Sequence, residues 1–248
     1  MIKLSPKNLV VWIWLVVFIS LPGASVAQDL SISLGDGGSL TNRSLQLFAL
    51  ITVLSLAPGI AIMVTCFPFI VTVLSILRQA IGLQQSPPNM LIVSLALFLT
   101  WFVMEPVFAT AWQNGLQPLL DEQIDVETAF TATIDPFRVF MAARVDPETY
   151  ASMAALRDAD QLLDATKEAP LSIMVPSFLL SEVSRAFQIG FLIFLPFLII
   201  DLVVAAVLMS MGMMMVPPAV VSLPFKLAFF VVADGWSLVA GSLVRSYF

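Results

Sequence analysis

The sequence has no histidine and only one cysteine, Cys66, among its 248 residues. Without histidine the chain cannot form a Ser-His-Asp or Cys-His catalytic arrangement, and it has no imidazole to bind zinc or haem. One cysteine excludes a disulfide within the chain and any cysteine cluster for zinc or iron–sulfur. We therefore expect no catalytic residues, no metal site and no cofactor.

Charged residues are also scarce, at 11% of the chain, whereas 59% of the residues are hydrophobic. A soluble domain has about 25% charged residues. The 11 bases and 17 acids give a net charge of −6, so the chain lacks the basic surface that binds nucleic acid. It also lacks a GxxxxGK[ST] loop, so any use of ATP would belong to a partner. The composition indicates an integral membrane protein.

The N-terminus has the order of a secretory signal. Two lysines precede the apolar run Leu9–Ile19, and small residues follow up to Ala27. This pattern predicts a signal peptide over residues 1–27, cleaved after Ala27. An uncleaved anchor is the less favoured alternative, because an 11-residue apolar run is short beside the roughly 20 residues needed to span a bilayer. Residues 28–44 are polar and glycine-rich, which predicts a flexible leader.

Apolar segments predict an all-α protein built from helical hairpins. Residues 45–113 form the first hairpin, whose opening segment of 34 uncharged residues, Ser44–Leu77, is interrupted by Pro58-Gly59 and Pro68. Because proline removes a backbone donor, such broken helices are tolerated where neighbouring protein satisfies the freed groups. Residues 181–248 form the second hairpin, with Val216-Pro217-Pro218 at its tip.

Residues 114–180 differ in character from both hairpins. Between positions 114 and 170, 11 acidic residues stand against 4 bases. This predicts a soluble, acidic, helical region between the hairpins, and the acids are mostly a solvated face. The signal peptide and the excess of positive charge on cytoplasmic loops place this region outside the cytoplasm. Within it, Pro136–Met141 is either a docking patch for a partner or a small local core.

Methionine is concentrated at the second hairpin's tip. Five of the seven residues from Met209 to Met215 are methionine. Methionine side chains are flexible and polarizable, so a ring of them could close around variable cargo. Gly212 and the following prolines favour a loop that presents these side chains over a gap-filling helix end.

Charged residues stand within the second hairpin's apolar segments: Glu182 and Arg185 open the first of them, Asp201 interrupts it, and Lys226 and Asp234 lie in the second. Each would cost about 2.5–3.5 kcal/mol at the centre of a bilayer, so each needs a partner or water. Lys226 could pair with Glu182 or with Asp201, and the spacing does not decide between them. The charges could form a proton or ion relay or lock subunits together; a hydrolase using Asp201 and Asp234 is the weakest alternative, because neither residue lies in an aspartyl-enzyme motif.

Several stretches together resemble one family. They are LRQAIG (Leu77–Gly82), QQSPPN (Gln84–Asn89), AFQIGF (Ala186–Phe191), FLPFLIID (Phe194–Asp201), MGMMMVPP (Met211–Pro218) and the segment from LPFK to DGW (Leu223–Trp236). From about Leu45 to the C-terminus, the chain resembles the FliP family of flagellar biosynthetic proteins. Members of this family are export-gate subunits of the flagellar type III secretion system.

The resemblance implies a non-enzymatic pore subunit in the bacterial inner membrane, within the flagellar basal body, with the acidic region on the periplasmic side. It implies about five copies in a ring-like or helical oligomer, assembled with the gate subunits Q and R beside the large export components A and B. Unfolded export substrates would pass through the conduit. A proton- or ion-coupled transporter that uses Asp201 and Glu182 is the alternative function.

The resemblance also assigns roles to individual residues. Met213, Met214 and Met215 match the methionine gasket that narrows the pore. Glu182 and Lys226 match a charge pair that links helices or subunits. Phe140 matches a position that contacts a neighbouring subunit.

Overall fold

A computed structural model describes residues 40–83, 87–157 and 169–248. The expected signal peptide and the leader up to residue 39 lie outside the described residues. The chain divides into two compact units, residues 1–54 and 55–248. The described part of the first unit is helical from Leu40 onwards, so the last residues of the expected leader belong to a helix. Its side chains at Leu45, Phe48 and Leu54 are exposed.

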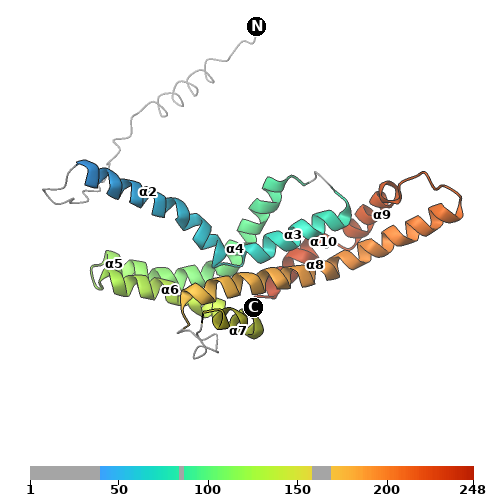
Figure 1. Ribbon diagram of the computed structural model, residues 1–248. Coiled ribbons are helices and arrows are strands. Elements are labelled where there is room, and N and C mark those ends of the chain that lie inside the picture. The colour runs from blue at the N-terminus through green and yellow to red at the C-terminus, as the bar shows by residue number, and fades with distance from the viewer. Residues whose placement is uncertain (1–39, 84–86, 158–168) are drawn as a thin grey trace, which may run out of the picture. The chain divides into compact units, whose positions relative to one another are not determined.

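The described residues are helical and contain no strand, which confirms the all-α expectation. The elements, labelled in Figure 1, are α2 (Leu40–Met63), α3 (Phe67–Ile81), α4 (Asn89–Ala111), the π-helical turn η1 (Trp112–Leu116), α5 (Gln117–Leu120), α6 (Val126–Ala142), α7 (Pro147–Ala155), α8 (Leu171–Ser210), α9 (Pro218–Val232) and α10 (Gly235–Arg245).

In the part of the chain that the structure describes, two helical segments are long and apolar enough to cross a membrane: Asn89–Leu120 and Leu171–Ser210. If each bent pair, α2 with α3 and α9 with α10, counts as one span, the described residues hold up to four. The second pair bends by 61° at Asp234, whose φ of 48° lies in the left-handed region. Broken apolar helices were expected, and the structure contains them.

Proline marks the first break less directly than the sequence indicated. Pro58 lies inside α2, and the break falls at residues 64–66 instead. Pro68 then occupies the first turn of α3. A first-turn proline has no helical partner for the N–H that it lacks, so it is tolerated there and favours a helix start. The expectation of two helical pieces is therefore correct, and the boundary is displaced from Pro58.

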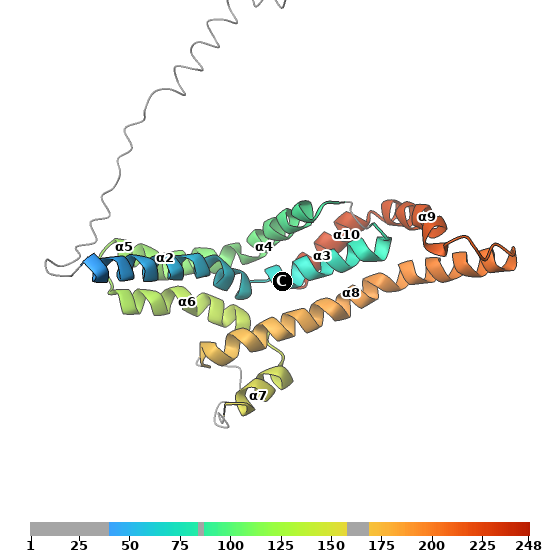
Figure 2. The same ribbon diagram turned by 45° about the horizontal axis from the view of Figure 1, so that its top comes forward.

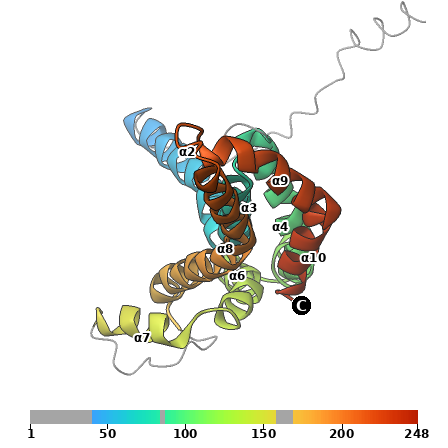
Figure 3. The same ribbon diagram turned by 90° about the vertical axis from the view of Figure 1, so that its right-hand side faces the viewer.

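The core of the second unit is built on α3. This helix packs against α8 on one side and against α4 on the other, and it also contacts α9 (Figures 2 and 3). Its buried side chains recur at helical spacing, as at Phe69, Val73 and Leu77. Gly190 of α8 permits the close approach, because a Cβ atom there would lie 2.4 Å from Ile76 Cδ1.

The acidic region is continuous with the helices on either side of it. α4 runs through η1 into α5, and α6 packs back against α4 and η1. α7 packs against α8, around a second cluster of buried residues that includes Met141, Tyr150 and Phe178. α8 itself extends unbroken for 40 residues, from inside the acidic region to the methionine-rich tip. One helix therefore connects the polar and apolar parts of the unit.

Candidate functional site

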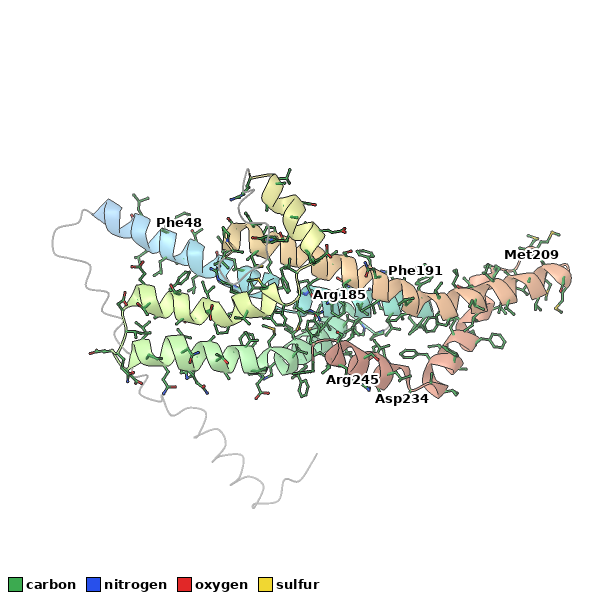
Figure 4. All side chains as sticks on the ribbon, turned by 90° about the horizontal axis from the view of Figure 1, so that it is seen from below. Phe48, Arg185, Phe191, Met209, Asp234 and Arg245 are labelled. Atoms are coloured by element: carbon green, nitrogen blue, oxygen red, sulfur yellow. The ribbon has the colours of Figure 1, made fainter. Side chains whose placement is uncertain are left out.

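The connection between α8 and α9 presents methionine side chains to the outside. We call Met211–Pro217 the methionine loop. Gly212 has a φ of +74°, a conformation that glycine adopts without strain, and Pro217-Pro218 starts α9. Met213, Met214 and Met215 are 38%, 84% and 98% exposed, so they are not part of this chain's core. Figure 4 shows this end of the hairpin beside the labelled Met209.

An apolar groove of about 640 Å³ lies between the arms of this hairpin. Its lining comes from both helices and from the loop, and includes Val203 and Val207 of α8, Met213 of the loop, and Val221 and Phe225 of α9. The arms of the hairpin are therefore incompletely packed against each other near the methionine loop.

A buried charge cluster forms around Glu182 near the other end of α8. We call Glu182, Arg144 and Tyr247 the Glu182 cluster. Glu182 has no exposed surface; its Oε1 accepts a hydrogen bond from Arg144 Nε at 3.2 Å, and its Oε2 accepts one from the Tyr247 hydroxyl. Both carboxylate oxygens thus have a partner within the chain. Such pairing is what a buried charge requires.

Aromatic rings enclose this cluster. The guanidinium of Arg144 lies 3.9 Å from the centroid of the Tyr247 ring, a cation–π contact. Tyr247 also stacks on Phe140, with ring centroids 6.0 Å apart, and meets the edge of Phe69 at 5.6 Å. Burial, together with the charge of Glu182, raises the pKa of the Tyr247 hydroxyl, so this hydroxyl stays protonated and donates.

A second ion pair joins α8 to α9. We call Asp201, Ser222 and Lys226 the Asp201 cluster. Lys226 Nζ lies 2.6 Å from Asp201 Oδ2 and also donates to the carbonyl oxygen of Ala80 at 3.1 Å. The Ser222 hydroxyl donates to Asp201 Oδ1 at 2.5 Å. Lys226 is buried, whereas the side chain of Asp201 is 31% exposed.

These contacts decide which charges meet inside one chain. The sequence left Lys226 with two candidate partners, and the structure pairs it with Asp201. Glu182 pairs with Arg144, so the chain does not bring Glu182 and Lys226 together. The physical reason is that Glu182 and Asp201 lie 19 positions apart on the continuous helix α8, so each faces a different neighbour.

Phe140 lies inside the unit's aromatic packing. Besides Tyr247, it contacts Phe178 edge-on, with centroids 5.8 Å apart. The segment Pro136–Met141 thus supplies a local core, one of the two roles that its composition allowed. A contact of Phe140 with a neighbouring subunit stays a prediction.

Arg144 and Tyr247 were not identified from the sequence. Arg144 is one of four bases in the acidic region, and Tyr247 is the penultimate residue. They lie 38 and 65 positions from Glu182. A usable signal was present, because a carboxylate in an apolar segment requires a cation and a donor from somewhere in the chain.

Most residues of the methionine loop and of both charge clusters lie between position 169 and the C-terminus. Beside the Glu182 cluster, Asp146 caps α7: its carboxylate accepts from the backbone N–H and the hydroxyl of Thr149, which lowers its pKa. Its own backbone N–H donates to the Ser181 hydroxyl at 2.9 Å. This contact holds the start of α7 against α8 beside Glu182.

Comparison with known proteins gives consistent matches over most of the chain. The FliP family model matches residues 50–243. The flagellar biosynthetic protein FliP of Caulobacter vibrioides is 55% identical over 228 residues, which cover 92% of this chain and 85% of that protein. The proteins of the same name from Agrobacterium fabrum and Bacillus subtilis are each 47% identical, over 93% and 83% of this chain and 96% and 93% of their own lengths. The matched region contains the methionine loop and both ion pairs.

Proposed function

The chain belongs to the FliP family, and from this premise we propose that it is a core subunit of the flagellar type III protein export gate. In this role it lines a conduit through which unfolded flagellar substrates cross the inner membrane, and it is required for flagellum assembly. It performs no catalysis. The names of its relatives, which are flagellar biosynthetic proteins, support this assignment.

The observation that carries the pore assignment is the exposure of the methionine loop. Met214 and Met215 are almost fully exposed in a single chain, although they are large and apolar. In a ring of copies these side chains would meet at the centre and close it. Because methionine is flexible, such a gasket could seal around chains of different shape and reclose after them.

Assembly supplies the ring. About five copies associate with each other and with gate subunits Q and R, next to export components A and B, in contact with membrane lipid. Glu182 and Lys226 support this assembly by fixing the shape of each subunit, through Arg144 and Asp201 respectively. The acidic region faces the periplasm, and Phe140 contributes to its contact with a neighbouring copy.

The alternative function, a proton- or ion-coupled transporter, has weaker support. A relay residue needs access to water or to a free partner. Glu182 has neither, since it has no exposed surface and both of its oxygens accept hydrogen bonds. The side chain of Asp201 is 31% exposed, but its two oxygens accept hydrogen bonds from Lys226 and Ser222. Both carboxylates are held by hydrogen bonds within the chain, which favours a structural role over a relay.

Ion conductance tests the gasket directly. Replacing Met213, Met214 and Met215 with alanine should leave assembly with Q and R intact and raise ion leakage across membranes that contain the complex. Met63→Ala and Met90→Ala, at exposed methionines outside the loop, are matched controls and should not change conductance. The gasket assignment would be contradicted if the triple variant had unchanged conductance in a complex that native mass spectrometry shows to have normal composition.

A further inference from the structure

The last residues of the chain converge on the Glu182 cluster. Ser246 and Tyr247 follow α10, which ends at Arg245. The Ser246 carbonyl oxygen accepts a hydrogen bond from Arg144 Nη1 at 2.7 Å, and the Tyr247 hydroxyl donates to Glu182. We call these two residues the C-terminal clasp. Phe248, the final residue, is 79% exposed and has no part in these contacts.

The clasp supplies half of the bonding of the Glu182 carboxylate. One oxygen is bonded by Arg144 and the other by Tyr247. Without the Tyr247 hydroxyl, Oε2 would be an ionised oxygen in a fully buried position with no donor. Leaving a buried charged acceptor unsatisfied costs more than the hydrogen bond itself contributes.

The clasp also supplies most of the environment of Arg144. Nε donates to Glu182, Nη1 donates to Ser246, and the guanidinium face lies on the Tyr247 ring. Nη2 is buried and makes no hydrogen bond. Because one of its nitrogens is already unsatisfied, Arg144 depends strongly on the two contacts that come from the C-terminus.

We propose that the C-terminal clasp positions the Arg144–Glu182 pair, with Tyr247 as the positioning residue. By doing so it fixes α8, the end of α6 and the end of α10 as one rigid body. Since Glu182 is buried and both of its oxygens accept hydrogen bonds from Arg144 and Tyr247, a group from a second subunit reaches this carboxylate only after these contacts open. Glu182 therefore acts inside its own subunit. This last consequence deepens the assembly role proposed for Glu182 and rests on the proposed function, whereas the clasp itself does not.

Hydrogen exchange on the detergent-purified full chain tests the clasp without any reference to export. Tyr247→Phe keeps the ring and its contacts with Arg144, Phe140 and Phe69 but removes the donor. Amide exchange in the α10 peptide should accelerate by about tenfold or more, as expected for losing a hydrogen bond to a charged group. Phe248→Ala, one position further on, should leave exchange unchanged.

A double-mutant comparison separates positioning from packing. In a Glu182→Gln background the acceptor is neutral, so Tyr247→Phe should accelerate exchange clearly less than it does in the native chain. An equal acceleration in both backgrounds, or none in either, would overturn the proposal. If Tyr247→Phe accelerates exchange less in the Glu182→Gln background than in the native chain while the variants export substrates normally, the clasp is supported and the gate role of Glu182 is contradicted.

Discussion

The two regions near the ends of helix α8 differ in burial and in charge. At Glu182, the carboxylate is fully buried, and its two oxygens have partners from two distant parts of the sequence, Arg144 and Tyr247. Just beyond the other end of the helix, Met215 is 98% exposed and its neighbours carry no charge. The first region is completed by its own chain, whereas the second presents large apolar side chains that no described residue of the same chain covers. Function that needs other molecules is therefore expected at the loop, and structural integrity at the cluster.

Removing the Glu182 carboxylate tests the enclosed region and should have the largest effect. Glu182→Ala leaves the largely buried guanidinium of Arg144 beside a cavity, with no carboxylate. Breaking a buried pair from one side costs about 3–5 kcal/mol, so we expect a loss of that size in the free energy of unfolding, measured by denaturant titration in detergent.

Replacing both partners distinguishes a buried charge from a lost bond. The double variant Glu182→Leu with Arg144→Met leaves no uncompensated charge and should be milder than Glu182→Ala. A double variant that loses as much stability as the sum of its single variants would show no coupling between the two side chains, and the enclosed region would then be stabilised by packing and not by the ion pair.

The Asp201 cluster is an intermediate case, because only one of its charges is buried. Lys226→Met leaves Asp201, whose side chain is 31% exposed and still accepts from Ser222. We expect a loss of about 1.5–3 kcal/mol, the range for hydrogen bonds to charged groups. Asp201→Ala should cost more, since it strands Lys226 in a buried position with only the Ala80 carbonyl oxygen as acceptor.

The informative result is which of the two variants, Lys226→Met or Asp201→Ala, loses more free energy of unfolding, and the same denaturant titration measures it. If Lys226→Met is the more damaging, leaving the lysine without its carboxylate is not the main cost, and the ammonium contributes mainly through its hydrogen bond to the Ala80 carbonyl oxygen.

Much of the fold was predictable from the sequence, for physical reasons that also explain the failures. Long uncharged segments specify helices, and Gly212 with Pro217-Pro218 specifies the tip, because these signals are local. The break after α2 was misplaced because Pro58 lies inside the helix without ending it, and the chain breaks at residues 64–66 instead.

The partners of the buried charges were less predictable, because they are set by tertiary packing. The sequence showed that Glu182 needs a partner but could not show that Arg144 and Tyr247 meet it from opposite directions along the chain. Local patterns contain no information on contacts separated by 38 and 65 positions. The sequence predicted the Asp201–Lys226 pair as one of two alternatives, because both residues lie in the same hairpin.

The methionine loop should give the smallest change in stability. Replacing Met213, Met214 and Met215 with alanine removes side chains that are mostly exposed, and such substitutions usually change the free energy of unfolding by no more than about 0.5 kcal/mol. Denaturant titration of the isolated chain would measure this directly. A loss well above that value would mean that the loop packs against the groove between α8 and α9 within one subunit, through Met213. The contrast between the two ends of α8 would then disappear. An unchanged stability together with raised conductance in the assembled complex would instead assign the loop to the conduit, because side chains that do nothing for their own chain would have their effect only between chains.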